Sequence, residues 1–150
     1  MTVTEPRSRA AEFVGFFDEG WQIGAGERFF EHFLPRIHDD VVLTQPLAPA
    51  VRGSTQFRPS FEPVFKAIPD LRGKVASWGE TADGVIVELR MSGHLGGRPV
   101  RWTTMDRIVL EDGMIKERHA HFDPLPLVIA MLLRPQVSLP LLPALLRRRR

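Results

Sequence analysis

The sequence contains no cysteine. Disulfide bonds, thiolate metal sites and thiol nucleophiles are therefore excluded. The N-terminal stretch over residues 1–13 carries acidic residues and lacks an apolar core segment, so it is not typical of a secretory signal. We accordingly expect a cytoplasmic protein.

The chain also lacks an excess of one charge sign outside its last residues. Four of the 20 Lys and Arg residues form the run Arg147–Arg150; without them, 16 cationic residues stand against 18 Asp and Glu, a net charge of −2. A nearly neutral body favours small neutral or weakly charged ligands over polyanions. We therefore expect no nucleic-acid partner, although a basic sequence ordinarily suggests one.

The 150 residues are near the usual length of one domain, and their composition is ordinary for a soluble globular protein. Over residues 8–34, aromatic residues recur at three- and four-residue spacings, which predicts helices with one core-facing side. Gly20 and Gly24 are expected to divide this segment into two helices. A third helix is predicted to begin at the N-cap Ser54 and to extend to Ile68.

From Leu71 onward the pattern changes to strands. Residues 85–92 alternate between apolar and polar types, and residues 101–111 alternate strictly. Asp112-Gly113 is typical of a hairpin turn, so residues 114–123 are the predicted return strand. Helices followed by a strand meander predict an α+β fold, with the helices packed on one face of the sheet.

Several local strings stand out when they are read together with the order of helices and strands. They are Gly53 followed by Phe57 and Phe61, Ile68-Pro69-Asp70-Leu71, Asp112-Gly113-Met114-Ile115 leading to Phe122-Asp123, and the leucine-rich run over residues 124–130. Over residues 10–133 the chain thus resembles the nuclear transport factor 2-like superfamily, and most of all its SnoaL-like polyketide cyclase and ketosteroid isomerase-like branch.

The resemblance implies a cone-shaped domain over residues 8–133, with a curved antiparallel sheet wrapped on N-terminal helices and a short C-terminal helix and tail. It also implies a homodimer that forms through the exposed sheet face. The superfamily contains isomerases, cyclases, hydrolases, dehydratases and non-catalytic subunits, so the resemblance is specific for fold and weak for function.

The functional residues of relatives match this chain unevenly. The position of the ketosteroid isomerase base resembles Gln45, and that of its tyrosine resembles Phe17; the chain has no tyrosine. Its second oxyanion-hole acid matches Asp106 if a one-residue gap is allowed. The aspartate of limonene epoxide hydrolases falls on Ala120, whereas the aspartate of SnoaL-like cyclases falls on Asp123. The resemblance therefore argues against the isomerase and hydrolase reactions. The aspartate of the SnoaL-like cyclases is the one functional residue that is matched directly, by Asp123.

Asp106 lies on the strand face that also carries Trp102 and Ile108. A carboxylate on a core-facing strand face must be paired or protonated, because its burial alone is unfavourable. The register of the hairpin decides its partner, since a slip of one residue inverts every side chain. With a two-residue turn Asp106 faces His119, and with a three-residue loop and a glycine bulge it faces Arg118. Both registers remain open.

The two registers predict different chemistry. In the first, Asp106, His119, His121 and Asp123 share a pocket, and Asp123 or His119 removes a proton next to a carbonyl. In the second, an Asp106–Arg118 pair lines the pocket and either polarises a carbonyl or is structural. The catalytic candidates are Asp106, His119 and Asp123, and the ligand-binding candidates are Phe17, Trp102, Arg118 and His121.

Each candidate also has a structural interpretation. Asp106 is then a buried ion-pair partner, and the two histidines face solvent or a dimer interface. Asp123 precedes Pro124 and would cap the C-terminal helix. His119 and His121 alternate as two metal ligands would, but no third ligand has suitable spacing, so we expect neither a metal site nor a cofactor.

Residues 125–146 form an apolar stretch that is long enough to cross a membrane. Arg134, Gln136 and four prolines interrupt both the apolar run and the helix, so we do not predict a span. We expect a helix to about Leu133 that packs on the domain, near the pocket mouth. Residues 134–150 are interpreted as a loose or partner-docking tail, with weak attachment to an anionic membrane surface as a third alternative.

Two function hypotheses follow. The first is a cofactor-independent acid/base enzyme of cyclase, isomerase or hydrolase type that acts on an apolar cyclic or polyketide-like compound. The second is a ligand-binding or subunit module that keeps the pocket without chemistry. Convergence of Asp106, His119 and Asp123 on one hollow would favour the enzyme, and a hollow lined by Phe, Leu and Trp would favour the binder.

Overall fold

The computed structural model describes residues 8–138, and they form helices and strands in the predicted order. Residues 139–150, most of the predicted tail, lie outside the described residues. The helices are α1 (Arg9–Ile23), α2 (Glu27–Phe33), α3 (Phe57–Ala67), α4 (Leu125–Leu132) and α5 (Pro135–Ser138), with 3₁₀ turns η1 (Leu34–Arg36) and η2 (Ser54–Gln56). The strands are β1 (Ile37–Thr44), β2 (Val51–Arg52), β3 (Arg72–Glu80), β4 (Gly84–Leu95), β5 (Arg98–Glu111) and β6 (Met114–His121).

The first two helices are separated at Gly24 and not at Gly20. Gly24 adopts φ 74°, a left-handed conformation that ends α1. Gly20 lies inside α1, where an added Cβ would sit 2.4 Å from the Phe33 ring of α2. The glycine at position 20 thus serves close packing of the two helices, and the sequence prediction of a break there is wrong.

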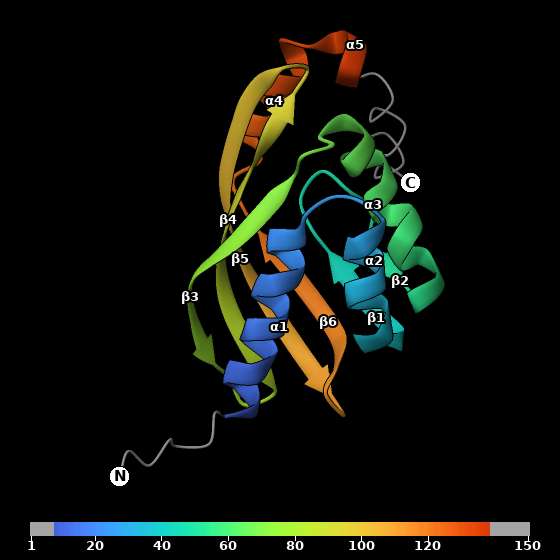
Figure 1. Cartoon of the computed structure of the whole chain (residues 1–150), viewed down its shortest axis with the longest axis vertical. Coiled ribbons are helices and arrows are strands. Elements are labelled where there is room, and N and C mark those ends of the chain that lie inside the picture. The colour runs from blue at the N-terminus through green and yellow to red at the C-terminus, as the bar shows by residue number, and fades with distance from the viewer. Residues whose placement is uncertain (1–7, 139–150) are drawn as a thin grey trace.

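The strands form one six-stranded sheet in the order β2-β1-β6-β5-β4-β3. Strands β3 to β6 are antiparallel neighbours joined by short turns. β1 instead runs parallel to β6, because the chain between them includes α3 and the meander and no hairpin joins the pair. The predicted α+β class is confirmed, but the curved sheet is mixed and not purely antiparallel as predicted, because β1 and β6 run parallel (Figure 1).

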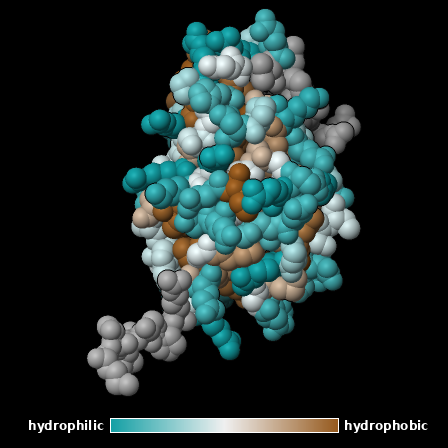
Figure 2. Space-filling model, in the orientation of Figure 1, coloured by the Kyte–Doolittle hydropathy of each residue, from teal (hydrophilic) through white to brown (hydrophobic). Residues whose placement is uncertain are grey.

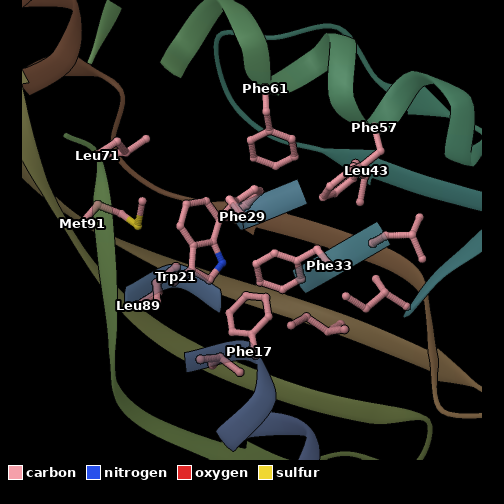
Figure 3. Packing of buried hydrophobic residues seen from close by; sticks show 14 of the residues in the cluster. Phe17, Trp21, Phe29, Phe33, Leu43, Phe57, Phe61, Leu71, Leu89 and Met91 are labelled. Atoms are coloured by element: carbon pink, nitrogen blue, oxygen red, sulfur yellow. The ribbon is translucent and has the colours of Figure 1, made fainter. Parts of the chain in front are cut away.

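Aromatic side chains of the three N-terminal helices form the core against the inner face of the sheet. Figure 3 shows Phe17 and Trp21 of α1 pointing toward rings that come from α2 and α3. Phe29 is central to this packing, with ring centroids 4.7 Å from Phe33 and 5.1 Å from Trp21. The predicted three- and four-residue aromatic spacing is therefore the core-facing stripe of these helices.

The face seen in Figure 2 is mostly hydrophilic, with hydrophobic side chains scattered over it. Among the described residues, no helix has the length and apolar character that a membrane crossing requires.

Candidate functional site

A cavity of about 540 Å³ lies between the inner face of the sheet, α3, α4 and the segment that follows β1. Its volume is in the range of pockets that hold small organic ligands. Most of its lining is apolar, and much of it is aromatic or proline. Representative lining residues are Trp21, Leu43, Phe61, Met91, Trp102 and Phe122.

The wall after β1 is built by residues 45–50, which connect β1 to β2. Pro46 and Pro49 keep this segment out of the sheet, because proline cannot donate to a strand ladder. Leu47 adopts φ 64°, an uncommon conformation for a residue with a side chain. The connection therefore forms a shaped wall beside the cavity.

The wall from α4 begins just after Asp123, whose side chain contacts the first residue of the helix. Asp123 accepts a hydrogen bond from the Leu125 backbone N–H at 3.0 Å. The helix then places Leu127 and Met131, four residues apart, on the side that lines the cavity. The short C-terminal helix predicted at the pocket mouth is thus present.

A buried ion pair forms the polar part of the cavity base. Nε of Arg118 donates a hydrogen bond to Oδ2 of Asp106 at 2.6 Å, and Nη2 forms an ion pair with the same oxygen at 2.6 Å. The Thr104 hydroxyl donates to Oδ1 of Asp106 at 2.7 Å. Asp106 is 0% exposed and Arg118 is 8% exposed. Arg118 and Thr104 line the cavity, whereas Asp106 lies behind them. The carboxylate therefore positions the two donors and does not itself face the cavity.

The Arg118 guanidinium also packs on an aromatic surface. Its Cζ atom lies 5.4 Å from the centroid of the Trp21 ring, within the usual range of a cation–π contact. The pair with Asp106 uses Nε and Nη2, so Nη1 takes no part in it. This arrangement holds a planar cation at the base of an apolar hollow.

The hairpin turn and a bulge together set this geometry. Asp112 and Gly113 have φ 51° and 75°, and Glu111 pairs with Met114, as the two-residue turn predicts. Beyond Leu110 the pairing shifts, because β6 has one extra residue at Lys116.

The shifted pairing places Asp106 opposite Ala120, and Ile108 opposite Arg118. Neither predicted pairing of Asp106 is therefore correct. The contact expected from the second register is nevertheless present, because Arg118 lies on the inner face and reaches diagonally to Asp106.

The same bulge turns the histidines away from the cavity. His119 lies on the other face, with Nδ1 2.6 Å from the Thr44 hydroxyl and Nε2 3.1 Å from the Glu117 carboxylate. His121 is exposed, and so is Asp123, whose carboxylate accepts a hydrogen bond from the Leu125 backbone N–H. The predicted convergence of two carboxylates and two histidines is thus wrong.

Two of the four predicted ligand-binding residues line the cavity. Trp102 does so beside Phe122, and Arg118 does so at the base. Phe17 is 1% exposed and belongs to the aromatic core instead. Among the described lining residues there is no Asp, Glu or His, and no metal-binding cluster occurs within residues 8–138.

Sequence reasoning did not assign several lining residues to the site. Gln45, Ser60 and Thr104 supply polar groups, and Trp21 supplies an aromatic wall. The sequence could have assigned Gln45 to the site, because Gln45 occupies the position that resembles the ketosteroid isomerase base. Trp21 had no signal beyond its helical spacing; its Nε1 is buried without a hydrogen-bond partner in the described part of the chain.

The chain was compared with known proteins, and a family model for the SnoaL-like domain matches residues 13–118. A search among curated proteins finds no match. Solved structures with the same fold include a protein from Jannaschia sp. CCS1 classed as a SnoaL-like polyketide cyclase. It is 22% identical, with 87% of this chain and 96% of that one covered and a TM-score of 0.71.

Two other solved structures are similar. An LEH-like epoxide hydrolase from M. tuberculosis is 20% identical, covers 87% of this chain and 94% of its own, and has a TM-score of 0.66. TerC, co-crystallised with polyporic acid, is 18% identical, covers 81% and 97%, and has a TM-score of 0.71. At these identities the structural likeness shows the fold alone. The family match and the shared architecture show that this chain belongs to the SnoaL-like domain family, with the nuclear transport factor 2-like fold.

Proposed function

We propose that the cavity binds an apolar, ring-containing small molecule and holds an acceptor oxygen of that molecule, such as a carbonyl, against Arg118. The observation that carries this proposal is a buried guanidinium at the base of an apolar cavity of about 540 Å³. Apolar walls supply affinity through burial, and a small number of fixed donors supply orientation. Thr104 adds a hydroxyl to the same base.

The ligand class follows from the chemistry of the base. Arg118 only donates hydrogen bonds, and its charge is balanced by Asp106 at 2.6 Å. At Arg118 a neutral ligand oxygen suits the cavity better than a carboxylate, because Asp106 already neutralises that guanidinium; the other lining cation, Arg52, is exposed. TerC, a similar solved structure, was co-crystallised with polyporic acid, which supports the view that this fold accommodates a small organic molecule.

A second candidate function is catalysis through polarisation of the bound carbonyl. Arg118 is held by a hydrogen bond and an ion pair with Asp106, and a preorganised donor stabilises negative charge as it develops on oxygen. The described lining supplies no carboxylate or imidazole to remove a proton. Such a reaction would therefore use water or a group of the substrate as the proton acceptor, and binding remains the better-supported function.

The test pairs a polycyclic ketone with its matching hydrocarbon. Affinities are measured by tryptophan fluorescence for the wild type and for the double variant D106L/R118M, which replaces the ion pair with apolar side chains and avoids leaving an unpaired buried charge. A hydrogen bond to a charged donor contributes about 1.5–3 kcal/mol, so the ketone should lose roughly 10- to 100-fold in affinity. The hydrocarbon should change little.

Equal losses for the ketone and the hydrocarbon would contradict the role of Arg118. Chromatography of the incubated ketones separates the two candidate functions. Conversion by the wild type, and not by the double variant, would favour catalysis, whereas unchanged ketone with tight binding would favour the binder.

A further inference from the structure

The base of the cavity presents two hydrogen-bonding groups, and Asp106 holds both of them. Arg118 contacts Oδ2 of Asp106, and the Thr104 hydroxyl donates to Oδ1. Because the two groups bind the two oxygens of one carboxylate, they lie next to each other. Both residues line the cavity, whereas Asp106 is fully buried behind them. A ligand that reaches the base therefore meets the two groups together.

The hydrogen bond to Asp106 decides what the Thr104 hydroxyl can offer to a ligand. A hydroxyl has one hydrogen and two lone pairs, whereas an ionised carboxylate only accepts hydrogen bonds. The Thr104 hydrogen is therefore committed to Oδ1 of Asp106, at an oxygen–oxygen distance of 2.7 Å. Among residues 8–138, no donor forms a hydrogen bond to the Thr104 oxygen. Thr104 thus keeps an acceptor for a ligand and has no donor left.

Arg118 offers the opposite character. Guanidinium nitrogens only donate, and Asp106 engages Nε and Nη2. Within the described part of the chain, Nη1 has no hydrogen-bond acceptor. The base of the cavity therefore presents a donor from Arg118 beside an acceptor from Thr104.

We propose that Thr104 makes the cavity specific for ketones that carry a hydroxyl group on the carbon next to the carbonyl. This inference rests on the proposed function, in which Arg118 donates to the carbonyl oxygen. The ligand hydroxyl then donates to the Thr104 oxygen. An unsubstituted ketone supplies no such donor, and a methoxy ketone adds bulk without one. A buried acceptor without a partner is unfavourable, so both of these ketones bind more weakly.

Two other polar side chains of the lining do not duplicate this pair. The Ser60 hydroxyl donates to the Phe57 carbonyl oxygen at 2.6 Å, so it is also left as an acceptor. Ser60 lies on α3, however, and not on the strands that carry Arg118 and Thr104. Gln45 carries an amide, which donates and accepts alike and so does not distinguish a hydroxyl from an ether oxygen. Ser60 is therefore a matched control for Thr104.

The experiment uses three bicyclic probes that differ at one carbon: 1-tetralone, 2-hydroxy-1-tetralone and 2-methoxy-1-tetralone. The two substituted ketones are measured as separate enantiomers. Isothermal titration calorimetry gives their affinities for the full-length wild type, Thr104→Val, Thr104→Ser and Ser60→Ala. The quantity compared is the ratio of the affinity for the hydroxy ketone to the affinity for 1-tetralone. General effects of a substitution on the cavity cancel in this ratio.

One hydrogen bond between neutral groups sets the expected size of the effect. In the wild type, the better enantiomer of the hydroxy ketone should bind roughly 3- to 10-fold more tightly than 1-tetralone, and the methoxy ketone should gain nothing. Valine has the shape of threonine without the oxygen, so Thr104→Val should lower the ratio to about one. Serine keeps the oxygen, so Thr104→Ser should retain the ratio within about twofold, as should Ser60→Ala.

Three results would overturn the proposal. The first is a methoxy ketone that binds the wild type as tightly as the hydroxy ketone does; this comparison needs no variant and decides the matter even if Thr104→Val does not fold. The second is a Thr104→Val protein, shown to be folded by circular dichroism, that keeps the wild-type ratio. The third is loss of the ratio in Ser60→Ala, which would assign the ligand hydroxyl to α3.

The affinity for 1-tetralone itself separates this proposal from the proposed function. If 1-tetralone binds the wild type and loses affinity in D106L/R118M, while the added hydroxyl brings no gain, only the role of Thr104 is refuted. If 1-tetralone does not bind the wild type, or binds D106L/R118M equally well, the proposed function fails and the role of Thr104 fails with it.

Discussion

Replacement of Asp106 by Asn tests the buried ion pair that organises the cavity base. The substitution keeps the side-chain size and removes the charge that balances Arg118. Asp106 is 0% exposed, accepts a hydrogen bond from Nε of Arg118 at 2.6 Å and one from Thr104 at 2.7 Å, and forms an ion pair with Nη2 of Arg118 at 2.6 Å. Loss of one partner of a buried pair costs about 3–5 kcal/mol, because the other charge stays buried and uncompensated.

That loss is a large part of the total stability of a small domain, which is about 5–15 kcal/mol. Urea unfolding followed by circular dichroism gives the free energy of unfolding for the wild type, D106N, R118M and D106L/R118M. Each single variant should lose about 3–5 kcal/mol, and the double variant should lose less than the sum of the two. A loss below about 1 kcal/mol in D106N, or additive losses in the double variant, would refute the argument.

Three further predictions concern packing, pH dependence and the position of the site. Gly20→Ala should cost about 1–3 kcal/mol in thermal unfolding, because its Cβ meets a buried phenylalanine ring at 2.4 Å, whereas Gly15→Ala has open space and should be neutral or stabilising. The side-chain and backbone hydrogen bonds from His94 lower the pKa of the Asp70 carboxyl. The stability that the ionised Asp70 carboxyl contributes is thus present above its ordinary pKa and is lost as the pH falls through its lowered pKa. The difference in unfolding free energy between the wild type and D70N should therefore shrink below about pH 4. A difference that grows on acidification would contradict the sign. His119→Asn should leave ketone affinity within about twofold, because the imidazole lies on the opposite sheet face; a loss like that of the ion-pair variant would contradict this placement.

The burial of Asp106 could be predicted from sequence, because strict alternation over residues 101–111 assigns every side chain to one of two faces. Its partner could not be predicted. The extra residue at Lys116 decides which β6 side chains face inward, and neither glycine nor proline marks that position. A bulge of this kind depends on the packing of the whole sheet and leaves no local signature.

Helix packing shows the same limit. The aromatic spacing predicted which side of α1 and α2 faces the core, yet Gly20 was read as a helix break. Its role depends on the approach of Phe33 from another helix, which is a tertiary contact. Gly24 was predicted correctly, because a left-handed helix end is a local property of the backbone.

Some parts of the cavity wall could be predicted from the sequence, and others could not. The C-terminal helix near the pocket mouth follows from the leucine-rich run after Asp123, and the side chain of that residue accepts a hydrogen bond from the first residue of the helix. The polar contribution of Ser60 required α3 to be placed against the connection after β1, which no spacing in the sequence specifies.

The most direct test of the central claim is a crystal structure of the protein with a bound polycyclic ketone. We expect the rings in the cavity between α3 and α4, with the carbonyl oxygen within hydrogen-bond distance of the Arg118 guanidinium. A ketone whose oxygen points to the cavity mouth, or that binds at another place, would contradict it.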